Sequence, residues 1–108
     1  MKKYIVYISP SAEKDIKEII SYISDGLLNK KAALDHYNLF YDTIKSLEYL
    51  PARNPISSFT TLAERGLRII RAGNYAFIYG ITEEQSRVDV YRVIYSRSDI
   101  ENNFDYSN

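Results

Sequence analysis

The sequence predicts an α+β fold in the order β-α-α-β-β-β, with an antiparallel sheet packed on a helical hairpin. Residues 67–97 contain three runs of β-branched and aromatic side chains separated by two turn signals, which is typical of a three-stranded meander. Residues 10–25 and 30–50 carry apolar side chains at helical spacing. Residues 3–8 are rich in strand-forming types, so we expect them to join the sheet.

The length and composition indicate a single domain spanning residues 1–108. Hydrophobic residues make up 45% of the chain, enough to bury a core. The absence of cysteine excludes disulfides, thiolate nucleophiles and cysteine-bound metals. We expect a cytoplasmic protein without a membrane span, because the N-terminal apolar run stops at Ser9-Pro10 and no segment approaches about 20 apolar residues.

The first strand has apolar side chains in both alternating sets, so we expect it to be buried, at least in part, on both faces. Ser9 and Pro10 suit the N-cap and first position of the helix that follows. Gly26 is expected to end this helix as a left-handed residue. The apolar stripe consists of Ala12, Ile16, Ile19, Ile20 and Ile23.

Asn29 suits the N-cap of the second helix, which we expect to end at Leu50, before Pro51. Its stripe consists of Ala33, Tyr37, Phe40, Ile44 and Leu47. The short link between the helices predicts an antiparallel αα-hairpin. Residues 51–66 carry turn chemistry, and two interpretations stay open: a functional loop or a plain surface connection.

Gly73-Asn74 predicts a tight hairpin turn with positive φ at the start of the meander. The middle strand places two sets of side chains on opposite faces. One set is Tyr75, Phe77, Tyr79 and Ile81, and the other is Ala76, Ile78 and Gly80. We expect the helices to cover the small-residue face, which would leave the aromatic face toward a cleft or partner. The opposite arrangement remains open.

The arginines are the strongest functional signal. The net charge is zero, but all lysines lie within residues 2–45 and all arginines within residues 53–97. The candidate cluster contains Arg68, Arg71, Arg92 and Arg97, among Tyr75, Tyr79, Tyr91 and Tyr95. Arginine with stacking aromatics suits nucleic acid, and would equally hold an acidic peptide. Strand parity prevents all four arginines from sharing a face without a bulge. Arg71 or Arg92 could instead be a structural ion-pair member, with Asp89 or Asp99 as partner.

Other chemistry has little support in the sequence. There is no phosphate-binding glycine loop, no Gly-x-Ser-x-Gly elbow and no His-Glu-x-x-His motif. The one histidine, His36, borders the apolar stripe of the second helix and is interpreted as structural. Glu83 and Glu84 lie in a predicted turn and are interpreted as solvated. We expect no metal and no cofactor.

The order of elements and three segments resemble the RelE/ParE superfamily of type II toxin–antitoxin toxins. The segments are residues 8–16, 74–79 and 91–99. The last resembles a ParE-type ending, Arg-Val-Leu-(His/Tyr)-Gly-Arg-Arg-Asp, with Ser96 and Ser98 in place of the glycine and the second arginine. The resemblance covers nearly the whole chain.

The resemblance implies a small toxin held inactive by a cognate antitoxin encoded beside it, whose C-terminal segment wraps the toxin. RelE-like members enter the ribosomal A site and cut mRNA, while ParE-like members bind DNA gyrase without bond-making of their own. In the cutting branch Arg68, Arg71 and Arg97 would hold the phosphate, and Tyr95 or Tyr75 would stack a base. In the gyrase branch we expect target contacts from Arg71, Tyr75, Arg92, Tyr95 and Arg97.

Departures from the cutting branch favour the gyrase branch. The cutting branch often has lysines where this chain has residues 67–70, of which only Arg68 is basic. It also usually has an arginine where this chain has Ala76. Oriented cations stabilise a phosphorane by several kcal/mol, so their loss would be costly. The zero net charge also fits poorly with an enzyme that must find RNA. A third alternative is an inactive binding module of the same fold.

Overall fold

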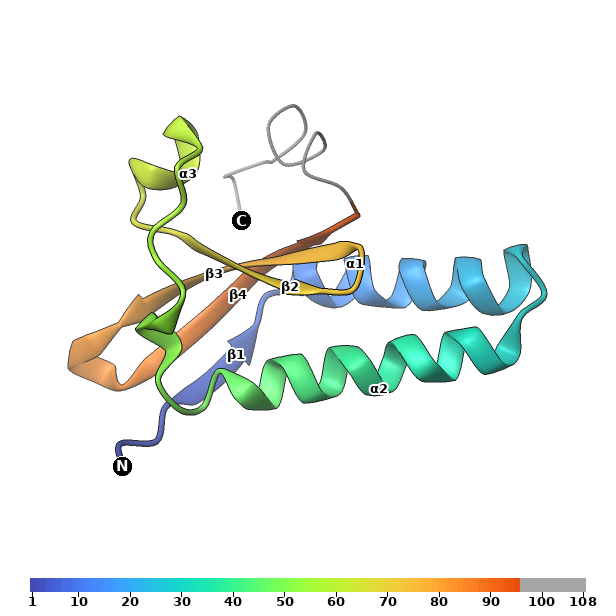
Figure 1. Ribbon diagram of the computed structural model, residues 1–108, viewed down its shortest axis with the longest axis horizontal. Helices are drawn as coiled ribbons and strands as arrows, with labels where there is room; N and C mark the ends of the chain where they lie inside the picture. The colour runs from blue at the N-terminus through green and yellow to red at the C-terminus, as the bar shows by residue number, and fades with distance from the viewer. Residues whose placement is uncertain (96–108) are drawn as a thin grey trace.

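A computed structural model of the chain describes residues 1–95. It contains strand β1 (Ile5–Ile8), helix α1 (Pro10–Ser21), a π-helical turn (Tyr22–Gly26), helix α2 (Lys30–Ser46), a 3₁₀ turn (Pro51–Arg53), helix α3 (Thr60–Ala63), strands β2 (Arg68–Ala72) and β3 (Tyr75–Thr82), a second 3₁₀ turn (Glu83–Gln85) and strand β4 (Arg87–Ile94). The predicted α+β class, the helical hairpin and the meander are confirmed, while the short helix α3 lies within the predicted loop (Figure 1).

The four strands form one sheet in the order β1-β4-β3-β2. β2, β3 and β4 are antiparallel neighbours, as predicted, but β1 pairs with β4 in parallel, so the sheet is mixed rather than wholly antiparallel. Parallel neighbours require a long crossover connection, and the two helices with β2 and β3 supply it here. The sequence contains no local signal for this pairing, because its two partners lie near opposite ends of the described chain.

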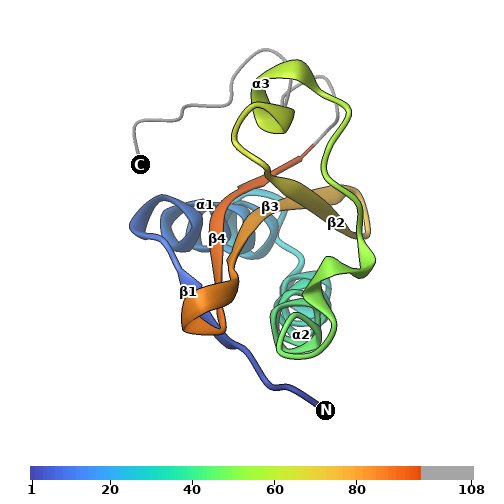
Figure 2. The same ribbon diagram turned by 90° about the vertical axis from the view of Figure 1, so that its left-hand side faces the viewer.

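β1 is an edge strand that is covered on one face only, which corrects the expectation of burial on both. Val6 and Ile8 are half-buried beside the helices, whereas Ile5 is 60% exposed and Tyr7 is 51% exposed. The helices lie against one face of the sheet (Figure 2). The outward side chains of this strand therefore stay largely exposed among residues 1–95.

The helices cover the aromatic face of β3, contrary to the expected orientation. Phe77 and Tyr79 are fully buried in the core between sheet and helices, and Phe40 of α2 meets Phe77 edge-on with ring centroids 5.3 Å apart. Large rings fill the wide space between a sheet and a helix layer. The small side chains instead face the segment that carries α3, where they admit Leu67 and Tyr91 closely. A Cβ on Gly80 would lie 3.1 Å from Leu67 and 3.3 Å from Tyr91.

Local signals set most helix ends. Ser9 and Asn29 are the N-caps of α1 and α2, and their side-chain oxygens accept main-chain N–H bonds from Ala12 and Ala32. Gly73 has a φ of 62° in the predicted hairpin turn.

Two details of the predicted helix ends were wrong. Gly26 is the last residue of the π-helical turn that extends the first helix, but the left-handed residue is Leu28, with a φ of 52°. α2 ends at Ser46 rather than Leu50. Arg53 donates from Nη1 to the carbonyls of Ser46, Tyr49 and Leu50, so it binds the carbonyls that the end of a helix leaves unpaired.

Residues 51–66 form a packed cover on the second face of the sheet. Leu62 of α3 is fully buried against Ile78, Ala76 and Ile94. The buried hydroxyl of Tyr79 donates to the carbonyl of Pro51 at 2.6 Å and accepts from Asn54 Nδ2 at 3.0 Å. This segment therefore has a structural role.

Candidate functional site

The side chains of the two arginines of β2 point to opposite faces of the sheet. Arg68 donates from Nη1 to the main-chain oxygens of Ala52 and Asn54, in the loop that precedes the strand. Arg71, three positions further along β2, is exposed. Since side chains alternate along a strand, residues three apart point to opposite faces. The pair expected to hold a phosphate therefore does not converge.

Arg92 lies in a half-buried ion pair with α1. Its Nε and Nη2 donate to the two carboxylate oxygens of Asp15 at 2.7 and 3.0 Å. Asp15 Oδ2 also accepts the main-chain N–H of Val93 at 2.9 Å. The side chains of Arg92 and Asp15 are 22% and 14% exposed. This geometry positions α1 against β4.

The sequence correctly marked Arg92 as a possible ion-pair member, but the proposed partners did not include Asp15. Asp89 pairs instead with Arg87, and Asp99 lies outside the described residues. A register shift between β3 and β4 next to Ile78 accompanies the pair. Val90 and Val93, three positions apart on β4, both face the helix-side core, which shows the extra residue of a bulge.

Tyr75 and Tyr95 meet at the end of the sheet near the hairpin turn. Their ring centroids are 5.3 Å apart, and Tyr75 also contacts Phe40 and His36 edge-on. His36 Nδ1 donates to the carbonyl of Ala32 at 2.8 Å, consistent with the structural role expected for it. Burial raises the pKa of Tyr75, and Tyr95 and Tyr22 act in the same direction. The hydroxyl of Tyr75 therefore stays neutral at physiological pH.

A cavity of about 620 Å³ opens between these tyrosines and the end of α1. We call it the tyrosine pocket. It is lined by Tyr22, Tyr75 and Tyr95, by Ile19, Ile23 and Leu27, and by Glu18. A second cavity of about 270 Å³ shares Glu18, Ile19 and Tyr95 with it and is bordered by Arg92 and Asp15. Three of the predicted target-binding residues, Tyr75, Arg92 and Tyr95, thus lie along one surface.

The remaining predicted residues lie elsewhere. Tyr79 is in the helix-side core, and Tyr91 packs against the cluster on the opposite face. Arg71 lines neither cavity. Arg97 falls outside the described residues.

Sequence reasoning missed the contribution of α1 to this surface. Asp15, Glu18, Ile19 and Tyr22 recur at spacings of three and four, so they lie along one side of the helix and its π-helical extension. That spacing was visible in the sequence. Tyr22, an exposed aromatic residue next to a helix end, is a further usable signal for this surface.

No group of three or more His, Asp or Glu residues suited to hold a metal ion occurs in residues 1–95. In the same part of the chain, no helix is both long enough and apolar enough to cross a membrane.

The chain belongs to the ParE toxin family of type II toxin–antitoxin systems (parDE), whose model matches residues 6–100. A search of curated proteins finds no match.

Solved structures that share the fold include the following three. A chain of a chromosomal ParDE TA system from P. aeruginosa superposes with a TM-score of 0.72 at 12% identity, covering 90% of this chain and all of that one. A chain of the RelBE2 toxin–antitoxin complex from Mycobacterium tuberculosis has a TM-score of 0.58 at 25% identity, covering 88% and 93%. A chain of the RelE–RelB complex from Pyrococcus horikoshii OT3 has a TM-score of 0.54 at 18% identity, covering 96% and 100%.

Proposed function

We propose that this chain is the toxin of a toxin–antitoxin pair, that it inhibits growth by binding DNA gyrase, and that a cognate antitoxin encoded beside it neutralises it in the cytoplasm. The observation that carries the proposal is the ParE family match across residues 6–100. One of the similar structures is described as a toxin–antitoxin complex and another as a RelE–RelB complex, which supports an antitoxin as partner.

The placement of the cations supports a binding mechanism over RNA cleavage. A phosphorane needs several oriented cations around one point, each worth several kcal/mol. Arg68 is held by loop carbonyls, and Arg71 points to the opposite face of β2. Ala76, at a position where the cutting branch has an arginine, is fully buried.

The surface we assign to the target runs along the end of β4. Tyr95 is 57% exposed there, beside the half-buried Tyr75 and the Arg92–Asp15 pair. Exposed tyrosine and arginine are the side chains that most often dominate protein–protein binding energy. Arg97 follows two positions after Tyr95 and is assigned to the same contact from its place in the sequence.

The test combines cells and purified components. We expect induction to arrest growth with intact mRNA, and the purified chain to inhibit gyrase supercoiling of plasmid DNA. Tyr95→Ala and Arg97→Ala should each weaken that inhibition about tenfold, the loss typical of a dominant contact. Tyr49→Ala is the control, because this 42% exposed tyrosine lies beyond the end of α2 and borders neither cavity.

The alternatives have distinct outcomes. Rapid mRNA cleavage at the ribosomal A site with normal supercoiling would replace the gyrase proposal by the ribonuclease. If cells that contain the folded chain continued to grow after induction, the chain would be an inactive binding module.

A further inference from the structure

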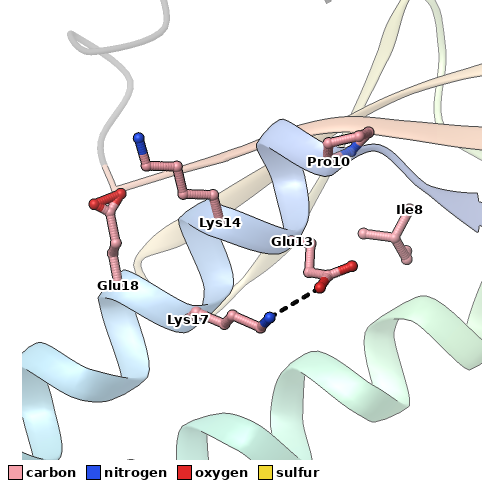
Figure 3. A pocket seen from close by; sticks show the side chains of 6 residues that line it. All are labelled: Ile8, Pro10, Glu13, Lys14, Lys17 and Glu18. Atoms are coloured by element: carbon pink, nitrogen blue, oxygen red, sulfur yellow. Dashed lines mark ion pairs between the residues drawn. The ribbon is translucent and has the colours of Figure 1, made fainter.

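The tyrosine pocket has no positive charge of its own within the described chain. None of its lining residues is basic, and Glu18 contributes a carboxylate. Glu18 forms no ion pair with the described residues. On the adjoining surface of α1, Glu13 is bound to Lys17 at 3.0 Å, whereas no ion pair joins Glu18 to Lys14 (Figure 3). Arg92 borders the neighbouring cavity and is neutralised by Asp15. Lys14 and Lys17 line a separate cavity on the other side of Glu18, and neither lines the tyrosine pocket.

The aromatic rings add to this negative character. Each ring presents an electron-rich face that attracts a cation. Tyr22 and Tyr95 are 62% and 57% exposed, so their rings are accessible to a partner. Tyr75 is half-buried below them, and its contact with Tyr95 holds the two rings at 66° to one another.

The apolar part of the lining suits the stem of a long side chain. Ile19, Ile23 and Leu27 border the cavity beside the rings. Long basic side chains commonly bury their methylene groups on apolar surface while the charged head stays at a polar rim. The guanidinium group also stacks on aromatic rings and pairs with carboxylates, whereas an ammonium is more strongly hydrated.

The π-helical turn builds one wall of this pocket. It carries Tyr22 and Ile23 and is followed directly by Leu27. The ring of Tyr22 lies against Gly26, where an added Cβ would be 3.0 Å from Cδ1 of the ring. Because Gly26 has no Cβ, there is room for the ring of Tyr22 in this position. Turns of this type occur often at functional sites.

We propose that the tyrosine pocket is a binding site for an arginine side chain presented by a protein partner. The inference rests on the proposed function in one respect, that the partner is a protein. The same charges argue against a phosphate or an acidic peptide in this pocket, so Tyr75 and Tyr95 would not serve to stack a base beside a phosphate. The guanidinium would lie over the tyrosine rings with Glu18 at its edge, and its stem would contact Ile19 and Leu27.

The test is an NMR titration of the full-length chain with N-acetyl-arginine methylamide at constant ionic strength. We expect saturable shifts confined to the ring signals of Tyr22, Tyr75 and Tyr95. N-acetyl-citrulline methylamide has nearly the same shape without the charge, and should bind at least about threefold more weakly, as expected for losing a cation–π contact and an exposed ion pair. N-acetyl-glutamate methylamide should not bind.

Two variants separate charge from shape. Glu18→Gln should raise the Kd for the arginine probe about threefold, the size expected for one exposed ion pair. Glu13→Gln is the matched control on α1, because Glu13 pairs with Lys17 and does not line the pocket. Tyr22→Leu keeps an apolar side chain but removes a ring, and should weaken binding similarly.

Equal binding of arginine and citrulline probes would overturn the proposal, as would preferential binding of glutamate or no saturable shift at these rings. The titration uses the isolated chain and gyrase inhibition is measured separately, so a negative result in one experiment can be told apart from a negative result in the other. If the arginine probe bound but gyrase were not inhibited, the binding site would stand and only the proposed target would be rejected.

Discussion

At the scale of single residues, Asp15 binds two groups of β4 that are distant from it in sequence. Its carboxylate binds the guanidinium of Arg92 through both oxygens and also accepts the N–H of Val93. Charge-assisted bonds of this kind are about twice as strong as neutral ones. Their loss in a half-buried setting leaves polar groups without compensation. The bonds of Asp15 also hold α1 in place at the border of the proposed target surface.

Asp15→Ala should lower the free energy of unfolding by about 2–3 kcal/mol, because all three bonds are lost. Asp15→Asn should cost less, about 1 kcal/mol, since an amide oxygen can still accept from Val93. Urea denaturation followed by circular dichroism measures both. Glu13→Gln, which removes an exposed pair, is the control and should change stability by less than about 0.5 kcal/mol. Equal losses for Asp15→Ala and Glu13→Gln would contradict the structural weight given to this pair.

At the scale of elements, the beginning of α1 is attached to β4 through one hydroxyl. Ser9 Oγ accepts the N–H of Ala12 at 3.0 Å and donates to the carbonyl of Tyr91 at 2.8 Å. The first bond caps the helix and the second joins the helix to the bulged part of the sheet. The cap was visible in the sequence, but the bond to Tyr91 was not, because it depends on the parallel pairing of β1 with β4.

Ser9→Ala should destabilise the chain by about 1–2 kcal/mol, the upper part of the range for losing an N-cap. Thermal and urea unfolding measure this loss. Ser11→Ala is the matched control, two residues further along the chain. The Ser11 side chain forms no hydrogen bond with the described residues, so the variant should change stability by less than about 0.5 kcal/mol. If the two variants unfolded at the same urea concentration, Ser9 would not act as a cap.

At the scale of the whole molecule, the N-terminal segment is fastened to the turn between β3 and β4. The hydroxyl of Tyr4 donates to Glu83, with 2.7 and 3.1 Å to the two carboxylate oxygens, and Lys2 adds an ion pair at 3.5 Å. The hydrogen bond from Tyr4 is the main cause that lowers the pKa of Glu83, and the charge of Lys2 acts in the same direction. The same bond raises the pKa of Tyr4.

These shifts predict a pH window for the contact. Folding lowers the pKa of Glu83. The stabilisation from its contact with Tyr4 is therefore fully present above the pKa of an unfolded glutamate, and it is lost as the pH falls through the lowered pKa. Because the pKa of Tyr4 is raised, the contact is also lost at alkaline pH as the hydroxyl ionises. Tyr4→Phe should therefore be less stable than the native chain at neutral pH, and the difference should shrink as the pH falls through the lowered pKa of Glu83.

Urea midpoints measured across this range test the prediction. Tyr41→Phe is the control, since Tyr41 is 54% exposed and its hydroxyl has no bond to the described residues. A stability difference for Tyr4→Phe that stayed constant from neutral to acid pH would show that packing of the ring, and not the bond to Glu83, is what the variant removes.

The sequence by itself determined the α+β class, the order of the elements, the caps at Ser9 and Asn29, and the turn at Gly73. Each of these depends on a residue and its near neighbours. The family resemblance rested on the same kind of local segment and was confirmed. The roles of Arg71, Tyr75, Arg92, Tyr95 and Arg97 in target binding stay predictions.

The tertiary structure alone decided which face of β3 the helices cover, that β1 runs parallel to β4, and that Arg92 pairs with Asp15. It also brought Tyr22 and Glu18 of the first helical segment to Tyr75 and Tyr95 of the sheet. These contacts join residues that are far apart in the chain. The pattern within one segment limits which faces are apolar, but it does not say which other segment will cover them, because that choice depends on how all the layers fill space together.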